Sequence, residues 1–63
     1  MTEQEIIDNK PDNTATHYVY DVDVYFSTLT GTYFDKATKS WEITDFMTEE
    51  DLLLNYTHVL KLI

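Results

Sequence analysis

The chain has 63 residues, with twelve Asp and Glu, four Lys, no Arg and a formal net charge of −8. This charge argues against nucleic acid and anionic membranes as partners, because contacts with phosphate depend on Lys and Arg. It favours a basic partner, in particular a protein that normally binds nucleic acid, although solubility alone explains acidity in many small proteins. The chain has no cysteine, so neither a disulfide nor a thiolate metal site can stabilise it. A domain of this length buries only about 60% of its unfolded surface and needs very good packing or oligomerisation.

Residues 1–16 are polar apart from Ile6 and Ile7, and residues 10–13 form a turn-favouring cluster. We predict a flexible acidic arm here, followed by a single domain over residues 17–63; a short helical turn at Glu3–Ile7 remains possible. The segment lacks a basic start and a long apolar run, so no signal peptide is expected. No apolar run of the chain is long enough to span a bilayer.

Residues His17–Ser27 alternate strictly between two sets of side chains. One set is Tyr18, Tyr20, Val22, Val24 and Phe26; the other is His17, Val19, Asp21, Asp23 and Tyr25. A period of two in β-branched and aromatic residues predicts one long, half-buried strand, whose second face meets solvent through its two carboxylates.

The next segment predicts a hairpin. "TLTG" at Thr28–Gly31 is a turn in which the only glycine of the chain supplies a positive φ. Thr32–Asp35 then returns as an antiparallel strand. Residues 36–43 form either a loop or a second tight turn leading to a short strand, and Trp41 is either a core or a rim residue.

Residues 45–55 predict a helix, because Thr44 and Thr48 are both candidate N-caps and four acids follow them in the first turns. At helical spacing, one stripe contains Phe46, Met47, Leu53 and Leu54, with Glu50 in its middle. We expect Leu53 and Leu54 to pack on the sheet while Phe46 and Met47 overhang its edge, ringed by acids. An ordinary core position or a hydrophobic staple is the alternative for Phe46.

Residues 56–63 predict a third strand that is largely apolar on both faces, which suggests burial against a second copy of the chain. The expected fold is therefore α+β: a three-stranded antiparallel sheet in the order β-β-α-β, with one helix packed on it. We expect no enzyme, no metal and no cofactor. His17 and His58 lack a nearby Ser or Cys arrangement, and no ligand set completes a metal site around Asp21 and Asp23.

Several short motifs occur in a shared order: "YDV" at Tyr20–Val22, the hairpin Gly31, "TDF" at Thr44–Phe46 and the terminal "HVLKLI". In these motifs, and in length and charge, the chain resembles the small uracil-DNA glycosylase inhibitors of Bacillus phages. The first three motifs recur at the same mutual spacing, and the similarity covers about residues 19–63. The family has Ser-Asp-Phe where this chain has "TDF".

The resemblance implies a homodimer whose sheets join and whose helices pack together, acting in the host bacterial cytoplasm. It implies binding to the DNA-binding cleft of uracil-DNA glycosylase, with Phe46 helping to form a hydrophobic pocket for the leucine that the enzyme inserts into DNA. Asp45 would be the acidic neighbour of this anchor. Because Met47 stands where the family has an acid, a carboxylate contact there would move to Glu49 or Glu50.

Two other functions remain open. One is an acidic dimeric module, a DNA mimic or a regulatory subunit, that binds a different basic protein such as a nuclease, a polymerase or an immunity complex. The other is a plain adaptor whose hairpin displays Tyr33 and Trp41. We include Tyr33 with Asp45, Phe46, Met47, Glu49 and Glu50 among the expected partner-binding residues.

Overall fold

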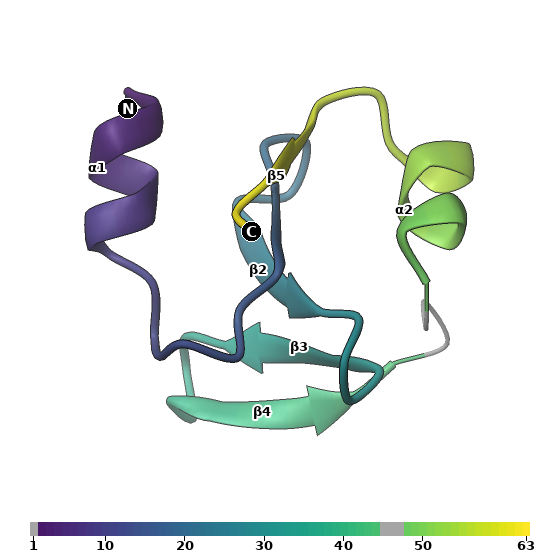
Figure 1. The fold of residues 1–63 in the computed structure, drawn as a ribbon. Helices are drawn as coiled ribbons and strands as arrows, with labels where there is room; N and C mark the ends of the chain where they lie inside the picture. Colours follow the sequence, from purple (N-terminus) through teal and green to yellow (C-terminus); the bar gives the residue numbers. More distant parts are fainter. Residues whose placement is uncertain (1, 45–47) are drawn as a thin grey trace.

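The computed structural model describes residues 2–44 and 48–63, which form five strands and two helices. Both helices are short and lie on opposite sides of the sheet (Figure 1). In chain order the elements are α1 (Glu3–Asp8), β1 (His17–Val19), β2 (Val24–Ser27), β3 (Thr32–Asp35), β4 (Ser40–Ile43), α2 (Glu49–Asn55) and β5 (Val59–Lys61).

The five strands form one antiparallel sheet in the order β4-β3-β2-β1-β5. β1 to β4 follow one another as a meander, and β5 returns after α2 to pair with the free side of β1. The central pairing sets Tyr18 opposite both Tyr25 and Leu60. The α+β class is therefore confirmed, whereas the expected three-stranded sheet is wrong in its strand number.

The main correction concerns the long strand predicted over His17–Ser27, which is two strands joined by a turn at residues 20–23. Asp23 takes a positive φ of 54° there, a conformation that Asp tolerates better than most residues. Its carboxylate accepts hydrogen bonds from the Tyr18 hydroxyl and from Lys36 Nζ, the latter at 2.6 Å. These contacts stabilise a reversal that the alternating pattern hides.

This reversal redistributes the side chains between the two faces of the sheet. Tyr18 and Phe26, which the alternation places together, belong to different buried clusters. The cluster on the α1 side contains Ile6, Ala15, Tyr18 and Tyr25, flanked by Phe34, Trp41, Leu60 and Leu62. The cluster on the α2 side contains Val19, Phe26 and Leu52, flanked by Val24, Tyr33, Tyr56 and Val59. The protein therefore has three layers, with a thin core on each side of the sheet (Figure 1).

The segment predicted as a flexible arm instead contributes α1 to the first of these cores. Thr2 and Glu5 form a reciprocal capping box at its start, and Ile6 is completely buried. The Tyr25 hydroxyl donates a hydrogen bond to the carbonyl of Ile6. Trp41 also packs on this side, and its indole nitrogen donates to Asp12 at 3.0 Å. Tertiary packing thus fixes a helix that is too short to be stable alone.

The predicted hairpin is confirmed, and of the two alternatives for residues 36–43 the second turn followed by a strand is observed. Gly31 has a φ of 65°, as the turn between β2 and β3 requires. Residues 36–39 form a second tight turn, with Lys39 at a φ of 55°, and β4 follows from Ser40. The terminal strand is shorter than predicted and lies at the edge of the sheet, with β1 on one side. Within the described residues, neither helix is long and apolar enough to cross a membrane.

Candidate functional site

Helix α2 carries the acidic residues that the sequence singles out, but it begins later than predicted. Thr48 is its N-cap, and the Thr48 hydroxyl accepts a hydrogen bond from the Asp51 backbone nitrogen at 3.2 Å. The first turn consists of Glu49, Glu50 and Asp51. Carboxylates are favourable at this end of a helix because its backbone N–H groups carry partial positive charge. The second of the two candidate caps, Thr48, therefore caps α2.

The apolar stripe predicted for this helix is wrong at its C-terminal half. Leu52 is the residue of α2 that is completely buried, while the exposed fractions of Leu53 and Leu54 are 57% and 79%. A helix of two turns cannot bury three consecutive leucines against one face, because they spread over most of its circumference. Leu53 and Leu54 thus extend from α2 beside its acidic first turn.

The expected partner-binding residues fall into three groups. Asp45, Phe46 and Met47 lie outside the described residues. Glu50 is exposed on α2. Glu49 and Tyr33 are half-buried on the α2 side of the sheet, where Tyr33 packs against Phe26 with ring centroids 6.3 Å apart. Tyr33 is therefore part of the structural support beneath this face.

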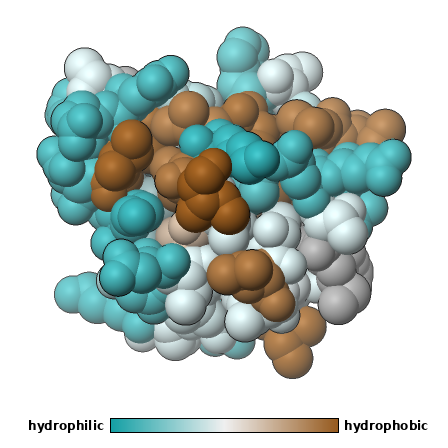
Figure 2. Space-filling model, in the orientation of Figure 1, coloured by the Kyte–Doolittle hydropathy of each residue, from teal (hydrophilic) through white to brown (hydrophobic). Residues whose placement is uncertain are grey.

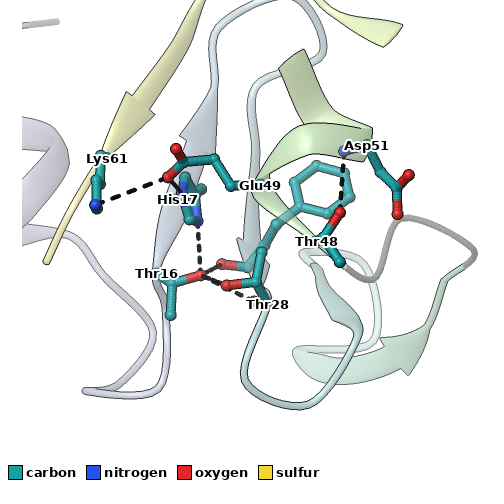
Figure 3. Close-up of polar contacts among 8 residues, drawn as sticks. Thr16, His17, Thr28, Thr48, Glu49, Asp51 and Lys61 are labelled. Carbon is teal, nitrogen blue, oxygen red and sulfur yellow. Dashed lines mark hydrogen bonds and ion pairs between the residues drawn. The ribbon is translucent and has the colours of Figure 1, made fainter. Parts of the chain in front are cut away.

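Glu49 is held by a contact that crosses from α2 to the sheet (Figure 3). Its Oε2 lies 2.6 Å from Nε2 of His17, a residue of β1 that is 2% exposed. Lys61 of β5 approaches the same oxygen at 4.0 Å. The contact between His17 and Glu49 joins residues far apart in the chain and fixes the first turn of the helix against β1.

The electrostatics of Glu49 follow from this contact. The hydrogen bond from His17 is the largest influence on the pKa of Glu49 and lowers it below its ordinary value. Partial desolvation opposes this effect, and the positive charge of Lys61 adds to the lowering. Glu49 is therefore an ionised carboxylate engaged within the molecule, whereas Glu50 beside it is exposed to solvent.

Behind His17 lies a cluster of hydroxyl groups centred on Thr16, which is completely buried. Thr16 Oγ1 lies 2.8 Å from Nδ1 of His17 and 3.1 Å from Oγ1 of Thr28, and it accepts a hydrogen bond from the Thr28 backbone nitrogen at 2.9 Å. The Phe26 carbonyl lies 3.3 Å away. Both ring nitrogens of His17 thus have partners.

Sequence reasoning did not find His17 as part of this site. The alternating pattern places it on the face of Asp21 and Asp23 and suggests a strand-capping or solvated histidine. The burial of His17 depends on β5 and α2 coming to lie beside β1, which are contacts between distant parts of the chain. A buried polar side chain requires a partner, but neither its position nor the identity of Glu49 follows from local spacing.

A second polar contact anchors the C-terminal end of the helix region. The Asp21 carboxylate accepts hydrogen bonds from the backbone nitrogens of Thr57 and His58 and from the Thr57 hydroxyl. The His58 and Thr57 donors lower the pKa of Asp21 to about 2. Through Asp21, the turn between β1 and β2 therefore holds the segment that leads from α2 into β5.

The surface around α2 is mixed in polarity. Figure 2 shows hydrophobic residues over α2, at the upper right, beside hydrophilic ones. On this helix the side chains of Leu53, Leu54 and Glu50 are exposed. Exposed apolar and charged side chains occur together in protein–protein interfaces, where an apolar centre is surrounded by a polar rim.

Neither a pocket nor a group of three or more metal-ligating side chains was found among residues 2–44 and 48–63. Comparisons with known proteins found no matching family model, no similar curated protein and no similar solved structure. The resemblance to the glycosylase inhibitors therefore depends on the motifs quoted above.

Proposed function

We propose that this chain is a DNA-mimicking inhibitor that binds the DNA-binding cleft of uracil-DNA glycosylase through the surface of α2. The observation that carries the proposal is the joint presence of the exposed Glu50 and of exposed leucines on this helix, whose first turn is acidic, in a chain of net charge −8. A cleft that accepts DNA is basic and also offers apolar contacts to sugars and bases. A mixed acidic and apolar surface is complementary to such a cleft.

The acids and the apolar groups would act at different stages of binding. The net negative charge attracts a basic cleft over several ångströms and speeds the encounter, an effect that salt weakens. Apolar side chains then supply most of the energy of the bound complex. Phe46, in the segment just before α2, is the proposed anchor that captures the inserting leucine, with Asp45 and Met47 beside it.

Glu50 is the proposed carboxylate contact, taking the place of an acid at position 47. Glu49 is less suited to this task because His17 already engages its carboxylate. Replacing Glu50 by Gln should therefore weaken binding more than replacing exposed acids on α1.

The proposed assembly is a homodimer. Large apolar side chains are exposed at separate places, with exposed fractions of 89% for Ile43, 79% for Leu54 and 69% for Ile63. β4 and β5 are the two edges of the sheet, and an edge strand offers backbone hydrogen-bonding groups to a second chain. Dimerisation is proposed to be required for the hydrophobic pocket.

A uracil-excision assay tests the proposal directly. Bacterial uracil-DNA glycosylase is titrated with wild-type chain, with Phe46→Ala and with Ile7→Ala, a control for an apolar side chain on the opposite side of the sheet. Wild type and Ile7→Ala should inhibit at near-equimolar amounts, whereas Phe46→Ala should need about tenfold more or higher. Equal inhibition by all three would remove Phe46 as the anchor but keep the target.

No inhibition at micromolar wild-type protein would overturn the glycosylase proposal. The exposed leucines and the exposed Glu50 of α2 would then favour the second candidate, an acidic dimeric module that binds another basic nucleic-acid-binding protein. A pull-down from a nuclease-treated bacterial lysate, with Leu54→Lys as the control, would identify that partner.

A further inference from the structure

Helix α2 is too short to hold its place without contacts to the sheet. It comprises the seven residues Glu49–Asn55, a length at which a helix is unstable without tertiary packing. Leu52 is its fully buried side chain. A hydrogen bond between Glu49 and His17 also connects α2 to the sheet, and Lys61 of β5 lies 4.0 Å from the same carboxylate oxygen (Figure 3). Polar contacts of Glu49 therefore contribute to fixing this helix.

The direction of this hydrogen bond follows from the chemistry of its partners. An ionised carboxylate only accepts hydrogen bonds, so Nε2 of His17 carries the proton and donates it to Glu49 Oε2 at 2.6 Å. Nδ1 is then bare in the neutral imidazole and protonated in the imidazolium. What happens at Nδ1 determines whether the buried ring can accept a charge without losing a hydrogen bond.

The Thr16 hydroxyl can form a hydrogen bond with Nδ1 of His17 whether or not Nδ1 carries a proton. When Nδ1 is bare, the Thr16 hydroxyl donates to it across 2.8 Å. When Nδ1 is protonated, it donates to Thr16 Oγ1, and the Thr16 hydrogen turns to the Phe26 carbonyl at 3.3 Å. A hydroxyl rotates at little cost, so no heavy atom has to move.

We propose that His17 and Glu49 form a proton-responsive latch that holds the first turn of α2 on the sheet, with the Thr16 hydroxyl adapting to either state of His17. The charged groups that act on the latch are Glu49 from α2 and Lys61 from β5, whereas β2 contributes the uncharged Thr28 hydroxyl and the Phe26 carbonyl. The inference concerns how the chain positions α2, and it stands whether or not glycosylase is the target.

The response to pH has a defined sign. Because the pKa of Glu49 is lower in the folded chain than its ordinary value of 4.5, its contribution is complete above that pH and is lost as the pH falls below it. The latch is therefore closed at neutral and mildly acidic pH and opens in strong acid, when Glu49 gains a proton.

A double-mutant cycle tests the latch. Urea unfolding is measured at pH 6 and at pH 3 for wild type, His17→Gln, Glu49→Gln and the double variant; Gln keeps a donor or an acceptor but does not titrate. At pH 6 the two substitutions should be coupled by about five- to tenfold in the unfolding equilibrium constant, and at pH 3 the coupling should largely disappear. A matched cycle with His58→Gln in place of His17→Gln should show no coupling. Additive effects of His17→Gln and Glu49→Gln at pH 6 would overturn the proposal.

Discussion

Several acidic side chains of this protein are engaged inside the molecule, although the net charge suggests a surface of unpaired carboxylates. Asp21 binds backbone donors before β5, Asp23 binds Tyr18 and Lys36, and Glu49 binds His17. Each of these contacts joins segments that are separated in the chain. Carboxylates available to a partner are therefore fewer than the composition implies, and Glu50 is the exposed one on α2.

Acid should release the contact made by Asp21. Because its pKa of about 2 lies below the ordinary value of 3.8, the carboxylate contributes fully to stability above about pH 4 and loses this contribution as the pH falls toward 2. Asp21→Asn should lower stability at pH 7 and flatten the fall between pH 4 and 2. Circular dichroism during acid titration measures both effects, with Glu3→Gln on α1 as a control. An unchanged acid profile in Asp21→Asn would show that the contact does not contribute.

Ser27 allows a test in which removal of a polar group should not destabilise the fold. Its hydroxyl is buried without a hydrogen-bond partner among the described residues. An unsatisfied buried hydroxyl destabilises a fold, so Ser27→Ala should leave stability unchanged or raise it by about 1 kcal/mol. Urea unfolding would measure the difference, and Thr16→Ala, which removes a fully engaged buried hydroxyl, should be destabilising instead. A Ser27→Ala variant that is clearly less stable than wild type would contradict this view of the site.

Among the helices and strands, those with strong local signals were predictable and those that depend on distant contacts were not. Gly31 and the strand Thr32–Asp35 follow from turn chemistry, and Thr48 was one of two candidate caps. The break at residues 20–23 was hidden because Asp21 and Asp23 fit the alternation as well as they fit a turn. Their roles become visible only when Lys36 and Thr57 lie beside them.

Helix α1 was also hard to predict from the sequence, because a single buried side chain determines its position. Ile6 is fully buried, while the neighbouring Ile7 is 37% exposed. Ile6→Ala should destabilise the protein by about 2–4 kcal/mol, and Ile7→Ala by much less. Urea unfolding of the two variants compares an identical chemical change at adjacent positions. Equal effects would indicate that α1 does not pack on the sheet in solution.

For the whole molecule, small size favours dimerisation, whereas the net charge opposes it. Two thin cores around one sheet leave large apolar side chains exposed, which favours the proposed dimer, yet each chain carries −8. Sedimentation equilibrium at micromolar protein should therefore show a dimer that tightens as salt screens this repulsion. A monomer at all salt concentrations, together with full inhibition of glycosylase, would show that one chain alone forms the pocket.

The candidate site was predictable only as a region. The density of acids and apolar residues between 41 and 54 pointed to α2, where Glu50, placed by helical spacing in the middle of the apolar stripe, is exposed. The roles of Glu49, Leu53 and Leu54 could not be predicted, because they depend on where the helix begins and on which face meets the sheet. Those two properties are set by Thr48, Leu52 and the buried His17.

One titration decides most directly whether the α2 surface binds a glycosylase. Unlabelled bacterial uracil-DNA glycosylase is added to the ¹⁵N-labelled chain, and the amide resonances are followed to saturation. Resonances of residues 44–54 should change at equimolar enzyme, those of α1 should change least, and excess duplex DNA should reverse the changes. No change at equimolar enzyme, or changes confined to α1 and the β3–β4 hairpin, would contradict the proposed site.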